Sequence, residues 1–135
     1  MSNTGTGKLN VEGGEVSGKV TNNSGASVNV AGGTLNNVTN SGAMAVSAGQ
    51  IDGNMSNATG GELTLSGTGA INKSLDNAGT LAMTGGTLNG SLDNGGTAAI
   101  SGGTVNADIN NASTMALSGV TVNGDLANAG ALTLG

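Results

Sequence analysis

The sequence contains no cysteine, histidine, proline or aromatic residue, and its only basic residues are Lys8, Lys19 and Lys73. Without cysteine it has no disulfide and no thiolate metal site. Three lysines are too few to neutralise a phosphate backbone or to hold an anionic membrane surface. No apolar run approaches the roughly 20 residues that span a bilayer. We therefore expect neither nucleic-acid binding nor membrane insertion.

What remains is a glycine-rich chain of 135 residues that includes 27 glycines and carries a net charge of −5. A single compact core is a poor expectation, because aromatic side chains usually supply much of the buried area in such cores. Disorder is also a poor expectation, because the charge is low and the apolar residues recur at a fixed phase. The composition favours a fold that stacks many small, similar units.

The units are visible in the C-terminal half. Residues 79–94 read GTLAMTGGTLNGSLDN, residues 96–111 read GTAAISGGTVNADINN, and residues 113–128 read STMALSGVTVNGDLAN. An asparagine closes each unit, and the same mark extends back to the N-terminus with a spacing between 17 and 20 residues. These asparagines are Asn3, Asn22, Asn40, Asn57, Asn77, Asn94, Asn111 and Asn128. A period near 17 across the whole chain predicts a repeat architecture.

Each unit contains short runs with period two, such as Leu81 and Met83 alternating with small residues. That alternation is typical of strands with one buried face. The glycines at 85–86, 90 and 95–96 fall between the runs, where tight corners favour glycine. We therefore predict an all-β, parallel β-solenoid (β-helix) of about seven to eight coils, forming a single domain over residues 1–135. Three corners suggest a triangular section, and a flattened section fits nearly as well.

The asparagine column has a structural and a functional interpretation. Identical amides stacked at strand spacing form a hydrogen-bonded ladder along the axis, whereas a polar row could instead bind a ligand. We favour the ladder, because stacking meets the hydrogen bonds of a buried amide that would otherwise be costly. The predicted ladder consists of Asn22, Asn40, Asn57, Asn77, Asn94, Asn111 and Asn128.

No constellation for catalysis is present. The serines and threonines have no base partner, and no glycine-rich segment continues into the Gly-Lys-Ser/Thr of a phosphate loop. Asp76, Asp93, Asp108 and Asp125 read as one outward residue per turn. Because the calcium-binding nonapeptide pattern is absent, a solvated acidic face is the favoured interpretation. We expect no enzyme activity, no metal and no cofactor.

Outward threonine and asparagine rows raise ice binding as a third possible role. The rows of the last units are regular, but Glu15, Gln50 and Ala70 occupy the column of Thr87. This irregularity counts against a continuous ice-binding face.

The units GTLAMTGGTLNGSLDN and GTAAISGGTVNADINN resemble the Gly/Asn/Thr/Ser-rich repeats of bacterial secreted adhesins, namely autotransporter passengers and filamentous-haemagglutinin-type proteins. The resemblance covers nearly the whole chain and is compositional and periodic. It implies a long parallel β-helix at the cell surface or outside the cell, of fibre, adhesin or biofilm-matrix type. A surface or glycan ligand is compatible with it, and it carries no catalytic residue.

A second resemblance is to bactofilins. The segments GGEVSGKV (13–20) and GGTLNGSL (85–92) are similar to the apolar-x-Gly-x-apolar rungs of those intracellular filament proteins. This second resemblance implies a cytoplasmic filament that assembles end to end. The scarcity of lysine and arginine fits the extracellular class better, and no signal peptide is visible after Met1.

Both resemblances raise the question of what covers the end coils. A terminal coil exposes unpaired strand edges, and neither end of the sequence has a helix, proline or charge cluster to cap it. We expect either stacking of copies end to end or continuation into further coils of a longer chain. The predicted contacts are Leu9 and Val11 at one end and Leu132 and Leu134 at the other.

Overall fold

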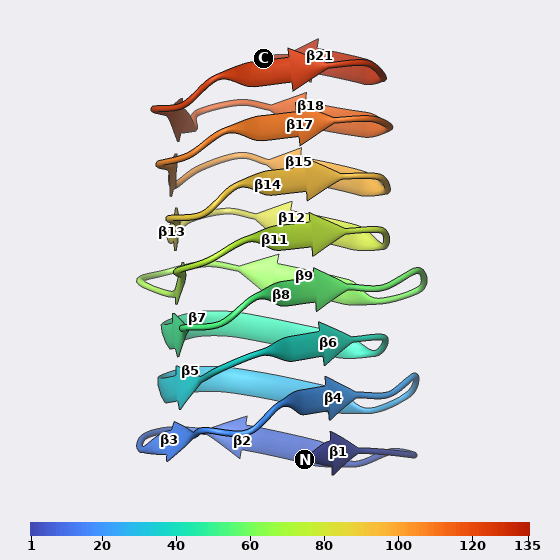
Figure 1. The fold of residues 1–135 in the computed structure, drawn as a ribbon, viewed down its shortest axis with the longest axis vertical. Coiled ribbons are helices and arrows are strands. Elements are labelled where there is room, and N and C mark those ends of the chain that lie inside the picture. The colour runs from blue at the N-terminus through green and yellow to red at the C-terminus, as the bar shows by residue number, and fades with distance from the viewer.

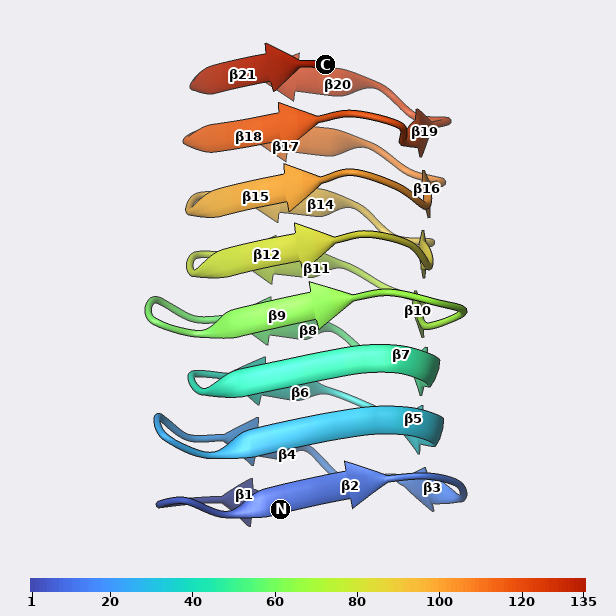
Figure 2. The same cartoon turned by 180° about the vertical axis from the view of Figure 1, so that it is seen from behind.

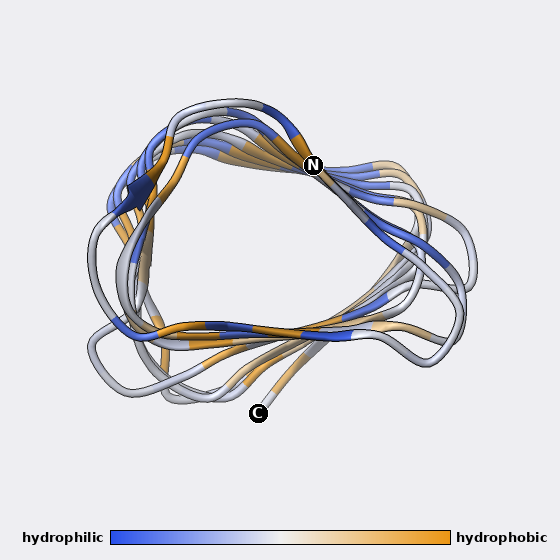
Figure 3. Cartoon of the chain, turned by 90° about the horizontal axis from the view of Figure 1, so that it is seen from below, coloured by the Kyte–Doolittle hydropathy of each residue, from blue (hydrophilic) through white to orange (hydrophobic).

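The computed structural model describes residues 1–135, which form strands β1 to β21 and no helix. The strands wind into turns that stack along one axis, with the termini at opposite ends of the rod (Figures 1 and 2). Seen along that axis, the turns superimpose as a rounded triangle (Figure 3). Every strand pair is parallel. The predicted all-β parallel β-solenoid is therefore confirmed, and of the two predicted sections the three-sided one is found.

The first side of the triangle is a sheet of eight strands, one from each turn. Most of its strands are three residues long and end at an asparagine of the predicted ladder. Its members are β1 (Ser2–Asn3), β4 (Val20–Asn22), β6 (Val38–Asn40), β8 (Met55–Asn57), β11 (Leu75–Asn77), β14 (Leu92–Asn94), β17 (Ile109–Asn111) and β20 (Leu126–Asn128).

The second side also has eight rungs, and its strands are the longest. Alternate side chains along each strand point into the core, as the period-two pattern predicts. Its members are β2 (Lys8–Val11), the start of β5 (Ser27–Leu35), the start of β7 (Ala43–Ile51), β9 (Glu62–Leu65), β12 (Thr80–Met83), β15 (Thr97–Ile100), β18 (Thr114–Leu117) and β21 (Ala131–Leu134).

The third side has only seven rungs, mostly strands of two residues. It joins the second side through β5 and β7, which run around the corner without a break, so that the two sides form one 13-stranded sheet. Its other members are β3 (Glu15–Val16), β10 (Ala70–Ile71), β13 (Thr87–Leu88), β16 (Thr104–Val105) and β19 (Thr121–Val122).

The core is a column of aliphatic side chains inside the triangle. One cluster of 24 buried residues runs from Val11 to Leu117, and each turn adds residues at the same inward positions. Leu81, Ala98 and Met115, for example, occupy one column in register on the second side. Side chains as short as alanine are tolerated there, because neighbouring turns supply the bulk. The structure has no helix with the length and apolar character that crossing a membrane requires.

The corner between the second and third sides depends on stacked glycines. Gly86 and Gly103 occupy equivalent corners of successive turns and have positive φ values of 81° and 85°. A Cβ atom on Gly103 would lie 2.6 Å from the Gly86 carbonyl oxygen and 2.7 Å from the Met83 methyl carbon. Glycine is required here both by the left-handed backbone and by the close approach of the turn beneath.

We expect Gly103→Ala to lower the free energy of unfolding by about 2 kcal/mol or more, because strain in the left-handed region adds to the clash. Gly13→Ala is the matched control. Gly13 has no positive φ, and nothing lies within 4 Å of the position that a Cβ atom would take there. Urea unfolding followed by far-UV circular dichroism measures both variants, and equal stabilities would contradict the corner assignment.

Candidate functional site

The predicted asparagine ladder is present inside the first side. In each step the side-chain Nδ2 of one asparagine donates to the Oδ1 of the next, at 2.7 to 2.9 Å. The six interior members are at most 2% exposed. The ladder begins one turn earlier than the seven residues assigned to it from sequence, because Asn3 donates to Asn22. Its last member, Asn128, is exposed.

Backbone carbonyls fix the orientation of each ladder amide. The Nδ2 of Asn94 lies 3.2 Å from the Gly96 carbonyl oxygen and 2.8 Å from the Thr114 carbonyl oxygen, in addition to Asn111 Oδ1. This donor therefore ties together the corner of its own turn and the second side of the next turn. No buried side-chain polar atom in the structure lacks a hydrogen-bond partner. The column is a structural element, and its six interior amides are engaged by hydrogen bonds within the rod.

All seven ladder bonds point the same way. The donor always belongs to the turn nearer the N-terminus and the acceptor to the turn nearer the C-terminus. At the N-terminal end, Asn3 receives no bond from another ladder member. At the C-terminal end, the Nδ2 of Asn128 has a single partner, the Gly130 carbonyl oxygen at 3.0 Å. The two ends are therefore chemically different.

A second ladder lies on the surface, at the corner between the third and first sides. Asn89, Asn106 and Asn123 each donate to the asparagine of the preceding turn at 2.8 Å, starting from Asn72. These bonds run opposite to those of the buried ladder. Sequence reasoning placed these residues on an outward face and missed their pairing. The 17-residue spacing of four asparagines was the signal that could have revealed it.

The four aspartates are exposed and occur once per turn, as predicted, and they form two columns on the surface. Asp76 pairs with Asp93 in register inside the strands of the first side. Asp108 and Asp125 lie one residue before strands β17 and β20, at the corner. Asn110 rather than Asp108 pairs with Asp93, so the two columns lie at different phases of the unit. No group of three or more acidic side chains could hold a metal ion.

The outward threonine rows are short. Thr80, Thr97 and Thr114 stack in register on the second side, but Glu62 continues the column. On the third side the column of Thr87 does pass through Ala70 and Gln50. Ala70 and Gln50 therefore interrupt the threonine column at the positions that the sequence predicted. Ice binding on either face remains a prediction.

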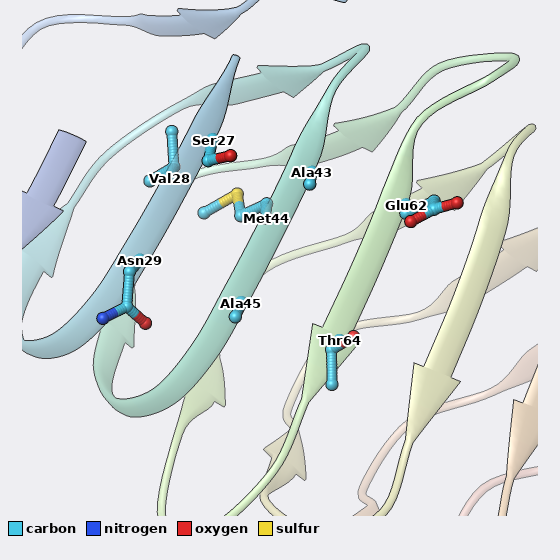
Figure 4. Close-up of a pocket in the computed structure, with 8 residues that line it drawn as sticks. All are labelled: Ser27, Val28, Asn29, Ala43, Met44, Ala45, Glu62 and Thr64. Carbon is cyan, nitrogen blue, oxygen red and sulfur yellow. The ribbon is translucent and has the colours of Figure 1, made fainter. Parts of the chain in front are cut away.

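A shallow hollow of about 330 Å³ lies on the outer surface of the second side (Figure 4). It exists because Ala43 and Ala45 lie between longer side chains on β5 and β9. Asn29, Thr64 and Glu62 border it, and Glu62 supplies its only charge. The hydroxyl groups of Ser27 and Thr64 and the carboxylate of Glu62 are the polar side-chain groups of its lining besides the Asn29 amide.

The end coils carry every large apolar side chain that is exposed. These are Met1 at 60%, Leu126 at 37% and Leu134 at 70%. Of the four end contacts predicted from sequence, Leu134 is exposed, and Leu9 and Leu132 are partly buried. Val11 is only 5% exposed and belongs to the core. The apolar columns of the rod therefore lie open at the C-terminal coil more than at the N-terminal coil.

Comparison of the chain with protein-family models, curated proteins and solved structures gives no match. The fold and the asparagine ladders thus define a β-helix repeat protein, and its resemblance to adhesins or to bactofilins stays an expectation.

Proposed function

We propose that this chain is a structural, non-catalytic β-solenoid whose copies join end to end into filaments. The observation that carries the proposal is the distribution of apolar surface. The three large exposed apolar side chains all lie on the end coils, while the sides of the rod present mainly small and polar residues. Large apolar side chains exposed beside unpaired strand edges are typical of an interaction surface.

Strand edges supply the second driving force. The last strands on the three sides, β19, β20 and β21, each have a neighbour on one edge only, as do β1, β2 and β3 at the other end. Another copy placed on such an edge forms parallel pairs of the type found between turns of the same chain. Strand addition of this kind gains backbone hydrogen bonds and buries alternate side chains.

We place these filaments at the cell surface or outside the cell, in a fibre, adhesin or biofilm-matrix role. The support is compositional: the chain has eight acidic and only three basic residues, and its repeats resemble those of secreted adhesins. A cytoplasmic, bactofilin-like filament is the alternative, and it rests on the rungs of residues 13–20 and 85–92. A surface or glycan ligand is left open by both.

Electron microscopy of the purified chain over a concentration series tests assembly directly. We expect filaments whose axial repeat is about 4.8 Å, the spacing of neighbouring strands. In Leu134→Glu the expected result is short, dispersed rods at the same concentrations, because a carboxylate then lies on the inward column above Leu117. A charge buried without a partner at the joint opposes association.

Thr133→Glu is the matched control. Thr133 lies on the same strand and is also exposed, but it pairs with Ala116 on the outward face. It should form filaments as the unmodified chain does. Dispersed rods of the unmodified chain at high concentration would contradict the proposal, as would filaments of Leu134→Glu that are as abundant as those of Thr133→Glu.

A further inference from the structure

We propose that copies of this chain join head to tail in one rotational register, in which Asn128 of one copy donates to Asn3 of the next and the buried ladder continues across the joint. This inference rests on the proposed assembly. It adds the polarity of the filament, the residues that meet and the surface left open. The occupant of each end is thus the opposite end of a second copy.

Polarity follows from the direction of the buried ladder. Asn128 presents Nδ2 donors at the C-terminal end, and Asn3 presents an Oδ1 that no other ladder member reaches. Only head-to-tail contact sets a donor against an acceptor. Two N-terminal ends would bring two acceptors together, and two C-terminal ends would bring two donors together. The amides do not flip to adapt, because backbone carbonyls hold Nδ2 of Asn3 and of Asn128 in place.

The bonds that Asn128 lacks identify its partners. Asn111, one turn below, reaches the Asn128 Oδ1 at 2.7 Å and the Ala131 carbonyl oxygen at 3.0 Å. The equivalent acceptors for Asn128 are the Oδ1 of Asn3 and the carbonyl oxygen of Lys8 in the next copy. Asn3 and Lys8 occupy these columns in the first turn, because Asn3 pairs with Asn22 and Lys8 with Ser27. The joint therefore repeats a step of the ladder that already occurs seven times in the chain.

The same register covers the exposed apolar side chains. Extending the pairing of β18 with β21 by one turn sets Leu132 against Leu9 and Leu134 against Val11 of the next copy. On the first side it sets Leu126 against Met1 and Ala127 against Ser2. All three large exposed apolar residues thus enter the joint. One register meets both the amides and the apolar columns.

Rotation of the second copy by one side of the triangle is the competing arrangement. It would seat β1 on the third side, above β19, where the rod is one rung short. It would also place Asn3 over the apolar column of Val122 and would set Asn128 against the aliphatic residues of β2. Two ladder amides would then be buried without amide partners, which is costly. The unrotated joint lacks only one rung, a two-residue strand on the third side between β19 and β3 of the next copy.

That omission leaves a slot on the third side of every joint. In the single chain the same place is a hollow of about 330 Å³, lined by Leu117, Val120, Val122 and Leu134 among its residues. Its floor is the free edge of β19, and in the filament its roof is β3 of the next copy. The filament therefore bears one apolar notch per copy, repeated along the third side.

Charge acts in the same sense. Asp108 and Asp125 lie on the last two turns, whereas on the first turn Glu12 and Glu15 balance Lys8 and Lys19. Contact between two C-terminal ends would bring the aspartates of both copies together, and like charges across an interface disfavour a pairing.

Cross-linking of single-cysteine variants tests polarity and register together, because the unmodified chain has no cysteine. Residues directly opposite on neighbouring strands lie within the Cα separation that a disulfide needs. Mixtures of Ala127→Cys with Ser2→Cys, and of Thr133→Cys with Asn10→Cys, should yield oxidised dimers. The mixture of Ala127→Cys with Asn10→Cys is the matched control and should yield at least tenfold less dimer. Electron microscopy of each mixture establishes that filaments are present.

Each outcome has a definite meaning. Filaments in which the control mixture cross-links at least as well as the expected pairs would overturn the register, and homodimers of Ser2→Cys or Ala127→Cys as the main product would overturn the polarity. Filaments without any cross-link would also overturn the proposed joint. Absence of filaments from every mixture and from the unmodified chain would contradict the proposed function itself, and the joint would fall with it.

Discussion

Asn94→Leu is expected to lower the free energy of unfolding by about 3–5 kcal/mol, although leucine is apolar and similar in size. Asn94 is 1% exposed. Its loss removes the Oδ1 that accepts from Asn77 and the donor that reaches Asn111 and the Thr114 carbonyl oxygen. Buried groups left without a partner cost about 1–3 kcal/mol each. Urea unfolding in the Leu134→Glu background keeps assembly from contributing to the measured stability.

Asn89→Leu separates burial from ladder formation. Asn89 also takes part in two amide–amide bonds of 2.8 Å, donating to Asn72 and accepting from Asn106, but it is exposed to water. Water replaces these bonds when they are lost, so we expect a change below about 1 kcal/mol. A loss as large as that of Asn94→Leu would mean that burial is not what gives the inner ladder its effect.

Leu92→Ala should destabilise the rod by about 2–5 kcal/mol, the usual range for a leucine deleted to alanine in a packed core. Leu92 is 0% exposed and lies between Leu75 and Ile109 on the first side. The cavity is held open by the turns above and below, whose backbones are fixed by parallel pairing, so it collapses little. Hydrogen exchange of the β11, β14 and β17 amides locates the loss, which we expect to concentrate there.

Leu126→Ala is the control in the same column. Leu126 pairs with Ile109 two turns above Leu92, and it is 37% exposed because no turn covers it. The same chemical change at this position should cost less than about 1 kcal/mol in the dispersed chain, because little apolar area is lost from the core. Equal losses at the two positions would contradict the burial gradient along the column.

The main features of the fold were predictable from the sequence because the repeat is visible in residue types. The alternation at Leu81 and Met83 predicted strands, and the regular asparagines predicted both the stacking and the buried ladder. The corners at 85–86, 90 and 95–96 also lie between strands, as expected. These predictions succeeded because a parallel stack repeats one local environment, so the pattern is sampled eight times.

Other features depended on distances that the pattern does not contain. The corner at Gly90 was predicted, but not the close approach there, where a Cβ would clash with Lys73 of the turn beneath. Likewise, the sequence does not reveal that β5 and β7 continue around this corner whereas β12 and β13 are separate strands, because Gly33, Gly49 and Gly86 all have positive φ there.

The constant register of the last turns bears on how the length of such a rod is inherited. From Asn77 to Asn128 each turn repeats after 17 residues and pairs only with the turns on either side. Duplication or deletion of one such unit in the gene therefore adds or removes a whole coil and leaves every other contact in place. Recombination between repeats therefore changes the length of the rod, and each product still consists of whole coils with the same fold.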